Sequence, residues 1–431
     1  MHKFIGYSAR FGSFSANCGN GCKTGEKVLT SREIFAREAK YGAHNYAPLP
    51  VALTKGEGIY VWDVEGKRYI DCIAAYSAVN QGHCHPKLVK LMREECGKLT
   101  LTSRAFYNDY LGEYAEFITK MFKYDKVLPM NTGVEACETA VKLARRWAYD
   151  KKGVKKNEAR VIFARNNFWG RSIAAVSASS DSQAYEGYGP FLPGFQQISY
   201  NDLRALEKEV EKPNTAAFMV EPIQGEAGVI VPTDGYLKAV QEICRNKNVL
   251  VIFDEVQSGL GRTGKMLAHY HEKNVRPDIV VLGKALSGGM YPVSAVLCDD
   301  EIMLNIKPGQ HGSTYGGNPL GCKLAKAALE ILVDEKLCEN SAKMGNVLKK
   351  RLERLPTKIV KEVRGRGLFL AIVIDQNVCK AWDVCLKLKE NGLLTKNTHG
   401  DTIRFTPPLV INQTQINEVG DIVEKTIKGF L

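Results

Sequence analysis

The sequence predicts an α/β fold in which a large domain, with a mostly parallel sheet flanked by helices, is joined to a smaller α+β domain. Short apolar runs alternate with segments of helix length through the middle of the 431-residue chain. Such runs are typical of strands that helices cover on both faces. A chain of this length also has room for two or three domains. The predicted strands lie at 161–164, 217–220, 249–253, 279–282 and 293–297.

Changes of pattern along the chain predict its division into parts. Residues 1–30 are expected to form a flexible leader, and residues 31–85 to form short strands that pack with the small domain. Residues 86–331 would form the large domain. From 332 onward a charged helical stretch, one strand candidate and two further helices predict a small C-terminal domain at 332–431.

The formal net charge of +12 at pH 7 raises the question of nucleic acid as a partner. The basic residues cluster only weakly, in one short run at 151–156, and aromatic residues do not alternate with them. A basic surface also attracts anionic metabolites, so we expect a small anionic ligand and no nucleic acid. No apolar run approaches the roughly 20 residues of a membrane span, so no membrane association is expected.

Cysteine usage and the first residues bear on where the protein works. The twelve cysteines are scattered, without the dense framework of a small secreted domain, which favours reduced intracellular thiols. The first 25 residues contain Lys3, Arg10, Lys23 and several serines but no acid. This composition resembles a short mitochondrial presequence, and a cytosolic leader fits it nearly as well. We therefore expect the cytoplasm or the mitochondrial matrix.

Polar residues stand at the ends of three predicted strands. Glu221 follows the run at 217–220, Asp254 follows 249–253, and Lys284 comes two residues after 279–282. Open α/β sheets bind ligands outside the carboxyl ends of their strands, so these side chains are expected to meet in one crevice. A desolvated lysine can form a Schiff base with an aldehyde, and a carboxylate can keep a pyridine nitrogen protonated. We predict Lys284 and Asp254 as the catalytic residues.

An anion site is predicted where a helix begins after Asn131 and Thr132. Val134, Cys137 and Val141 line one face of this helix at the expected spacing. Free amides and the positive end of the helix dipole would favour a phosphate there. An ordinary helix N-terminus explains the segment equally well.

Two other motifs carry weaker signals. Residues 259–264 match G-x-G-x-x-G, but five residues separate them from the preceding strand. In a dinucleotide fold the glycines form the strand-to-helix turn itself, so a nicotinamide oxidoreductase is disfavoured. His83, Cys84 and His85 are potential metal ligands, but adjacent residues do not easily share one tetrahedral site. We expect structural packing there and no metal.

Several strings, in order along the chain, resemble the class III, or ω, aminotransferases of the type I pyridoxal-phosphate (PLP) fold. The resemblance runs from about Tyr41 to the C-terminus. It implies PLP as the cofactor, transfer of an amino group between small-molecule substrates, and a homodimer with composite active sites. The strings are AYSAVNQGHCHP, NTGVEACETAVKLARRW, EPIQGEAGV, DEVQSGLGRTG, GKALSGGMYPVSAV and HGSTYGGNPLG.

The resemblance implies that four residues contact the cofactor ring or its aldehyde. Lys284 would hold the cofactor covalently and later move a proton. Asp254 would contact the ring nitrogen, and Gln257 the phenolic oxygen. Phe168, in the string FWGR, would stack on the ring.

The phosphate contacts implied by the resemblance come from two segments. Gly133 and Val134 match the phosphate-binding turn at the start of the predicted helix. Ser313 and Thr314 match contacts that the neighbouring subunit supplies. This arrangement is what makes the implied active sites composite.

The resemblance also implies a substrate-binding set, namely Tyr46, Tyr76, Arg171, Glu226 and Arg404. Tyr46 and Tyr76 match two tyrosines of members that act on ornithine. Arg171 would bind the distal carboxylate of 2-oxoglutarate, Arg404 would bind its α-carboxylate, and Glu226 would mask Arg404 while ornithine reacts. From the residues alone, a structural salt bridge explains Glu226 and Arg404 as well.

The activity implied is a two-stage, ping-pong transfer of the δ-amino group of L-ornithine to 2-oxoglutarate, which gives L-glutamate 5-semialdehyde and L-glutamate. Such a reaction would link arginine catabolism to proline biosynthesis. A sister enzyme that acts on N-acetylornithine or 4-aminobutyrate is the alternative within the family. An inactive binding protein is the alternative of another class, but a scaffold needs none of these charged residues.

Overall fold

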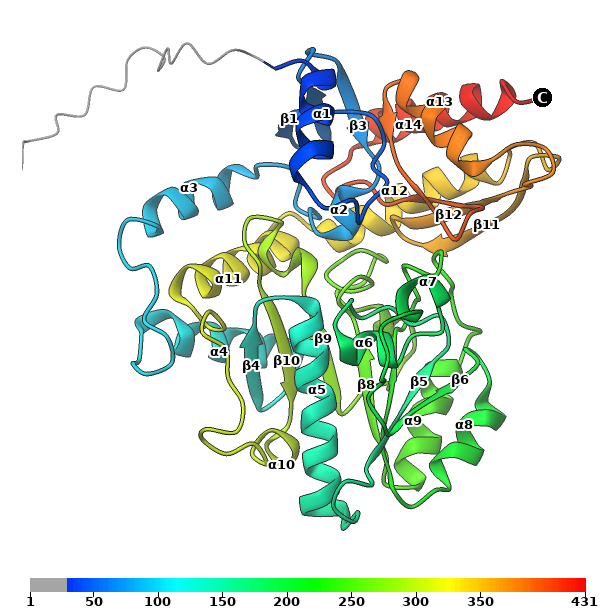
Figure 1. Cartoon of the computed structure of the whole chain (residues 1–431). Coiled ribbons are helices and arrows are strands. Elements are labelled where there is room, and N and C mark those ends of the chain that lie inside the picture. Colours follow the sequence, from blue (N-terminus) through cyan, green and yellow to red (C-terminus); the bar gives the residue numbers. More distant parts are fainter. Residues whose placement is uncertain (1–28) are drawn as a thin grey trace, which may run out of the picture.

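The computed structural model describes residues 29–431. The predicted leader therefore lies outside the described residues, apart from its last two positions. Figure 1 shows two parts, one built around the largest sheet and one that contains both α1 (Ser31–Tyr41) and the C-terminal helix α14 (Gln413–Lys428). In the described part of the chain, every helix is too short or too polar to cross a bilayer.

The largest sheet has seven strands in the order β4-β10-β9-β8-β7-β5-β6. β10 runs antiparallel to β4 and β9, and the other neighbours are parallel. All five predicted strands are present within two residues of their expected bounds, and the predicted α/β class is confirmed. The strands are β4 (Lys126–Met130), β5 (Arg160–Ala164), β6 (Phe195–Ile198), β7 (Thr215–Val220), β8 (Leu250–Asp254), β9 (Ile279–Leu282) and β10 (Ser294–Cys298).

Helices surround this sheet in the lower part of Figure 1. The longer ones are α3 (Pro86–Glu95), α4 (Asp109–Phe122), α5 (Gly133–Trp147), α8 (Leu203–Val210), α9 (Tyr236–Asn246) and α11 (Pro319–Asp334). The short ones are α6 (Ile173–Ser177), α7 (Ser182–Tyr185), α10 (Asp300–Met303), the π-turn η1 (Ala148–Lys152) and the 3₁₀ turns η2 (Ala268–His271) and η3 (Lys284–Ser287).

Coverage of both faces explains why the central strands are apolar throughout. Every residue of β7, β8, β9 and β10 is buried. Phe163 and Met219 belong to the core beneath α5, whereas Phe218 and Val251 belong to the core beneath α8 and α9. Because side chains alternate between the faces of a strand, a strand between two helix layers has no polar face.

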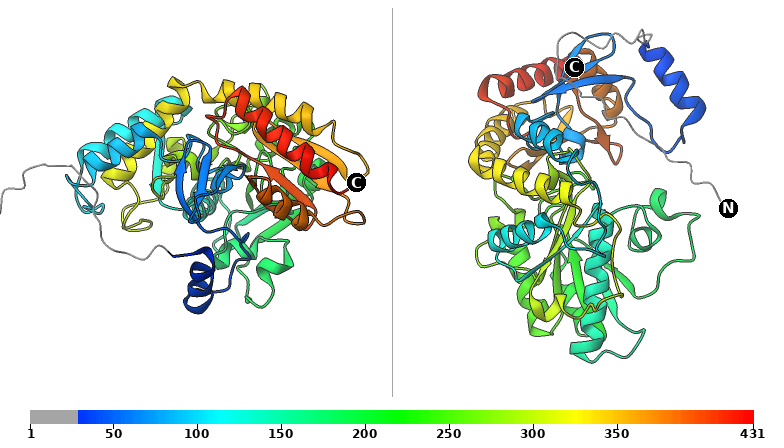
Figure 2. Two further views of the ribbon diagram at one scale, coloured as in Figure 1. Left: turned by 90° about the horizontal axis from the view of Figure 1, so that it is seen from above. Right: turned by 90° about the vertical axis from the view of Figure 1, so that its left-hand side faces the viewer.

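The second part combines the two ends of the chain. β3 pairs in parallel with β13, and Figure 2 shows the N-terminal strands beside the C-terminal segments. The boundary predicted at 331/332 would fall inside α11, and the domain boundaries stay predictions. The two sheets are β1 (Leu53–Glu57), β2 (Tyr60–Asp63), β3 (Arg68–Asp71) and β13 (Leu393–Leu394), and β11 (Val360–Arg366), β12 (Phe369–Ile374), β15 (Thr402–Phe405) and β14 (Asn397–Thr398). The further helices are α12 (Leu337–Leu352) and α13 (Ala381–Glu390).

The short helix α2 (Ala74–Ser77) is a left-handed turn. Its four residues have φ values of 46°, 48°, 58° and 70°. This conformation costs an L-residue roughly 1–2 kcal/mol, so surrounding contacts must hold it. One carboxylate oxygen of Asp71 accepts hydrogen bonds from the amides of Ile73 and Ala74, both at 2.9 Å. The turn is thus held by a nearby carboxylate, and its Tyr76 carbonyl oxygen also accepts a long-range hydrogen bond from Gln257 at 3.1 Å.

We predict that Ala75→Gly stabilises the protein by about 0.5–1 kcal/mol, because glycine adopts positive φ without steric cost. The side chain of Ala75 is exposed, so little packing is lost. The free energy of unfolding by denaturant measures the effect. The matched control is Ala115→Gly in α4, which should destabilise by about 1 kcal/mol because that helix is right-handed. Equal destabilisation by both changes would contradict the strain at Ala75.

Candidate active site

A cavity of about 200 Å³ lies at the carboxyl ends of β7, β8 and β9. It brings together Lys284 and Asp254, as the strand pattern predicts for an open α/β sheet. The sequence placed Glu221 at this edge of the sheet without giving it a role, and it did not assign Cys137 or Trp169 to the site. The cavity is lined by Gly133, Val134, Cys137, Phe168, Trp169, Gly170, Glu221, Asp254, Val256, Gln257 and Lys284.

Lys284 is the first residue of η3 and has a φ of 45°, in the left-handed region. Gly283 before it allows a close approach, because a Cβ there would lie 3.2 Å from the Val256 side chain. Desolvation lowers the pKa of Lys284 to about 8, although the carboxylates of Glu226 and Asp254 oppose this shift. A substantial fraction of the amine is therefore unprotonated, and nucleophilic, near neutral pH.

Asp254 is the last residue of β8 and is 5% exposed. Its Oδ1 accepts a hydrogen bond from the Val256 amide at 3.0 Å, and its Oδ2 accepts one from the Cys137 thiol at 3.4 Å. Burial raises the pKa of Asp254, while these two donors and Lys284 oppose the rise. The carboxylate is thus held in one orientation at the end of the cavity and suits a cationic partner.

Glu221 joins two loops of the site. Its Oε1 accepts a hydrogen bond from the Phe168 amide at 3.0 Å, and its Oε2 accepts one from the Gly225 amide at 3.2 Å. Burial, with the neighbouring Asp254 carboxylate, raises the pKa of Glu221 well above its ordinary value. Glu221 therefore fixes the backbone that precedes Arg171 and the backbone that precedes Glu226.

The start of α5 provides a built anion site. Thr132 and Glu135 form a capping box, so the helix begins at Gly133 with its first amides free of helical partners. A Cβ at Gly133 would lie 3.0 Å from Val256, and one at Gly170 would lie 2.5 Å from Val134. These glycines let three backbone segments approach closely around the free amides, where the helix dipole favours negative charge.

Gln257 lies between the cavity and the left-handed turn. Its Nε2 donates a hydrogen bond to the Tyr76 carbonyl oxygen at 3.1 Å, which leaves its Oε1 for another donor. The Tyr76 ring centroid lies 5.5 Å from the Arg404 guanidinium carbon. Tyr46, in contrast, is 72% exposed. The structure thus places Tyr76 beside Gln257 and Arg404 and leaves Tyr46 mainly exposed, and their contact with substrate stays a prediction.

Arg404 and Glu226 form an ion pair at the mouth of the site. The distance from Arg404 Nη1 to Glu226 Oε2 is 2.8 Å, and the two side chains are 3% and 30% exposed. Burial raises the pKa of Glu226, but the charge and hydrogen bond of Arg404 outweigh it, so the pKa lies below its ordinary value. Arg404 Nε is buried without a partner in the described chain. The pair is asymmetric, because Arg404 is buried and Glu226 is partly exposed.

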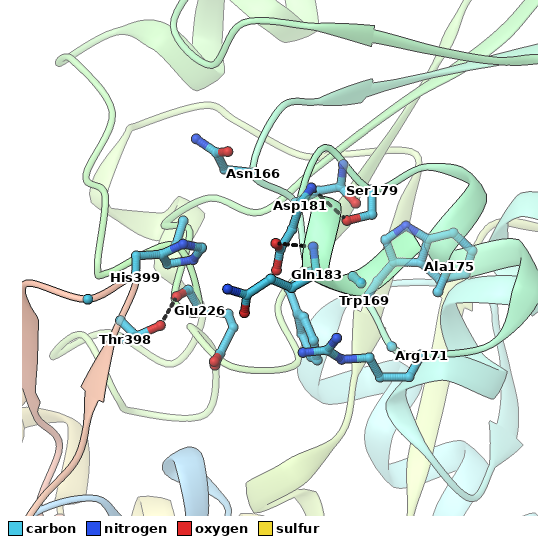
Figure 3. A pocket seen from close by; sticks show the side chains of 16 residues that line it. Asn166, Trp169, Arg171, Ala175, Ser179, Asp181, Gln183, Glu226, Thr398 and His399 are labelled. Atoms are coloured by element: carbon cyan, nitrogen blue, oxygen red, sulfur yellow. Dashed lines mark hydrogen bonds between the residues drawn. The ribbon is translucent and has the colours of Figure 1, made fainter. Parts of the chain in front are cut away.

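A second cavity, of about 490 Å³, adjoins the first through Phe168, Trp169 and Gly170. Figure 3 shows Arg171 and Trp169 on one side of it and Glu226, Thr398 and His399 on the other. The Thr398 hydroxyl donates to the Glu226 carbonyl oxygen at 2.9 Å, which ties the β14–β15 hairpin to the Glu226 loop. The cavity is a polar vestibule lined by Arg171, which suits a substrate carboxylate, and by the acids Asp181 and Glu226.

Ser313 and Thr314 do not line either cavity of this chain. The Ser313 hydroxyl oxygen accepts hydrogen bonds from Asn131 Nδ2 at 2.8 Å and from the Gly316 amide at 3.0 Å. Their contact with the phosphate of a neighbouring subunit stays a prediction.

The weaker motifs have structural roles. His83 Nε2 lies 2.7 Å from Asp71, and His85 Nε2 lies 2.9 Å from Glu335. Residues 259–264 form turns after β8 rather than a strand-to-helix turn. Among residues 29–431, no group of three or more His, Cys, Asp and Glu side chains is arranged to hold a metal ion.

Comparisons with known proteins agree with this geometry. The chain is 69% identical over 406 residues to a probable mitochondrial ornithine aminotransferase of Caenorhabditis elegans, covering 94% of this chain and 96% of the relative. It is 63% identical over 409 residues to the mitochondrial ornithine aminotransferase of Rattus norvegicus, covering 95% and 93%.

Solved structures give the same result. An ornithine aminotransferase of Toxoplasma gondii, described with partial PLP occupancy at its active site, matches with a TM-score of 0.92 at 47% identity over 94% of this chain and 96% of that chain. An acetylornithine aminotransferase of Elizabethkingia anophelis matches with a TM-score of 0.84 at 52% identity, covering 93% and 100%. The family model described as aminotransferase class-III matches residues 41–427, so the predicted family is confirmed and the chain belongs to the class-III aminotransferases.

Proposed function

We propose that the protein is a PLP-dependent ornithine aminotransferase, which converts L-ornithine and 2-oxoglutarate into L-glutamate 5-semialdehyde and L-glutamate. The observation that carries the proposal is one site in which Lys284 and Asp254 share a cavity and the Arg404–Glu226 pair stands at its mouth. Relatives at 63% and 69% identity are named ornithine aminotransferases. The semialdehyde would cyclise to pyrroline-5-carboxylate, between arginine catabolism and proline biosynthesis.

The site fits PLP on its own chemistry. The free amides of α5 suit a phosphate, and buried Asp254 suits a protonated ring nitrogen. Gln257 suits the phenolic oxygen, Phe168 suits the face of the ring, and the Lys284 amine suits the aldehyde. Bound PLP supplies an aldehyde for covalent capture of amines and a ring that accepts electrons from the reacting carbon.

Lys284 has two tasks in this proposal. As a desolvated amine with a pKa of about 8, it would hold the cofactor covalently until the substrate amine takes its place. It would then act as the general base for the proton on the δ carbon of ornithine. Asp254 would keep the ring nitrogen charged.

The Arg404–Glu226 pair explains how one site accepts two different substrates. With Glu226 on Arg404, the Arg404 guanidinium is not free for the α-carboxylate of ornithine, so the δ-amino end would be presented to the cofactor. When Glu226 swings into the vestibule, Arg404 binds the α-carboxylate of 2-oxoglutarate and Arg171 binds the distal one. The partial exposure of Glu226 supports this movement.

Substrate choice rests on the tyrosines in this proposal. Tyr46 would contact the α-amino and carboxylate groups of ornithine. Tyr76, which lies beside Arg404, would select the longer polar chain. Burial, followed by the Glu226 charge and, least, by Tyr46, raises the pKa of Tyr76, so the two tyrosines are close enough to act together. The likeness to a solved acetylornithine aminotransferase keeps that activity as the alternative.

We also propose a homodimer in the mitochondrial matrix. Phe106, Tyr107 and Tyr315 expose large aromatic side chains, which a partner subunit would cover. Tyr315 follows Ser313 and Thr314, the residues expected to reach the neighbouring phosphate. The relatives from Caenorhabditis elegans and Rattus norvegicus are named as mitochondrial.

Incubation of the purified protein with ornithine, 2-oxoglutarate and PLP should yield pyrroline-5-carboxylate, which o-aminobenzaldehyde traps as a coloured product. Lys284→Ala should lower the rate by roughly 10³-fold or more, because the general base is lost. The same assay with N-acetylornithine and 4-aminobutyrate tests the alternatives. Faster amino transfer from either amine than from ornithine would refute the substrate assignment.

Glu226→Gln should slow the half-reaction with ornithine roughly tenfold or more while the half-reaction with glutamate keeps its rate, because Arg404 is no longer masked by a charge. Single-turnover absorbance changes of the bound cofactor measure each half-reaction separately. The matched control is Asp234→Asn, which removes an exposed ion pair with Arg366. Equal slowing of both half-reactions would show that Glu226 does not select between substrates.

Capture of PLP by the cofactor-free protein should accelerate as the pH rises and level off above a midpoint near pH 8. The reason is that the Lys284 pKa is lowered to about 8, so below this pH the amine is protonated and not nucleophilic. The rate should therefore fall about tenfold for each pH unit below the midpoint. Stopped-flow absorbance measures the rate, and a midpoint near the ordinary lysine value of about 10.4 would contradict the desolvation of this amine.

A further inference from the structure

The thiol of Cys137 contacts the carboxylate that faces the cofactor cavity. Cys137 is fully buried, lines the cavity and lies 3.4 Å from Asp254 Oδ2. The other oxygen, Oδ1, is bound by the Val256 amide at 3.0 Å. Within the described residues 29–431, these are the two donors that hydrogen-bond to the Asp254 carboxylate, one for each oxygen.

Cys137 is a hydrogen-bond donor because its proton stays on the sulfur. Burial raises the pKa of the Cys137 thiol well above its ordinary value, and the negative charges of Asp254 and Glu221 raise it further. A thiol in this environment is inert as a nucleophile, and it can offer its proton to a neighbouring carboxylate.

The helix that carries Cys137 also carries the anion site. Cys137 lies one turn after Gly133 and three residues after Val134, so these positions share the face of α5 that is turned toward the cavity. The phosphate turn and the donor to Asp254 are therefore parts of one rigid element. A shift of α5 would move both ends of the cofactor site together.

We propose that Cys137 is a positioning residue, whose thiol fixes the plane and the negative charge of Asp254 and thereby keeps the proton on the ring nitrogen of the cofactor. The inference rests on the proposed function. The other charged or titratable groups that face Asp254 are Lys284 after β9, Glu221 after β7 and Glu255 on the same strand end. Without the thiol donor, the carboxylate gains proton affinity and the shared proton moves toward Asp254.

The test is the ¹⁵N chemical shift of ring-labelled PLP bound to the full-length protein at neutral pH. In the wild type the shift should report a protonated ring nitrogen. Cys137→Ala should raise the ratio of unprotonated to protonated nitrogen roughly two- to tenfold, the effect of one lost hydrogen bond. Cys137→Ser should restore the wild-type shift because the hydroxyl is also a donor.

The control is Cys244→Ala, which truncates a buried cysteine on the other side of the sheet and should leave the shift unchanged. The covalent adduct on Lys284 is measured in every variant, so loss of folding or of cofactor is seen directly. Wild-type shifts in Cys137→Ala with intact adduct would overturn the inference, as would equal changes in the Ala and Ser variants. Absence of an adduct in the wild type would instead refute the proposed function.

Discussion

Desolvation of ionisable groups at the carboxyl edge of the large sheet is the constraint on which the site depends. Lys284, Asp254 and Glu221 line a cavity of about 200 Å³, where few water molecules can stabilise their charges. The cost of burial lowers the pKa of the amine and raises the pKa of each acid. The Lys284 amine is therefore reactive, whereas Asp254 and Glu221 are held by fixed hydrogen-bond donors. The cationic ring nitrogen of PLP would pair with the Asp254 carboxylate.

Parts of the backbone around the site adopt a conformation that is unfavourable for L-residues. Lys284 and all four residues of α2 adopt positive φ, although none of them is glycine. Such strain persists only where surrounding contacts determine the conformation, as the Asp71 carboxylate does for α2. Gln257 is close to both strained segments, because it hydrogen-bonds to Tyr76 and lines the cavity with Lys284. The strained backbone and the cavity are therefore linked through Gln257.

The sequence predicted what local patterns encode. Central strands are uniformly apolar, so their ends, and with them Asp254 and Lys284, could be placed from spacing alone. β4 and β6 escaped prediction because they are the two edge strands, with partly exposed residues, a proline at 129 and two glutamines at 196–197. The left-handed turn has no local signal, since Ala-Ala-Tyr-Ser favours no such conformation. Glu226 and Arg404 are 178 residues apart in the sequence. Their pairing was expected only from the family resemblance, and the fold shows that they are in contact. The contact of Cys137 with Asp254 likewise needs the packing of α5 against β8.

The ε-amine of Lys284 is expected to be the covalent anchor of an aldehyde cofactor. Reduction of the purified protein with sodium borohydride, followed by mass spectrometry of its peptides, tests this linkage. The protein should be yellow, lose its colour on reduction and carry a single pyridoxyl group on Lys284. A colourless protein without such a group, or a pyridoxyl group on a different lysine, would contradict it.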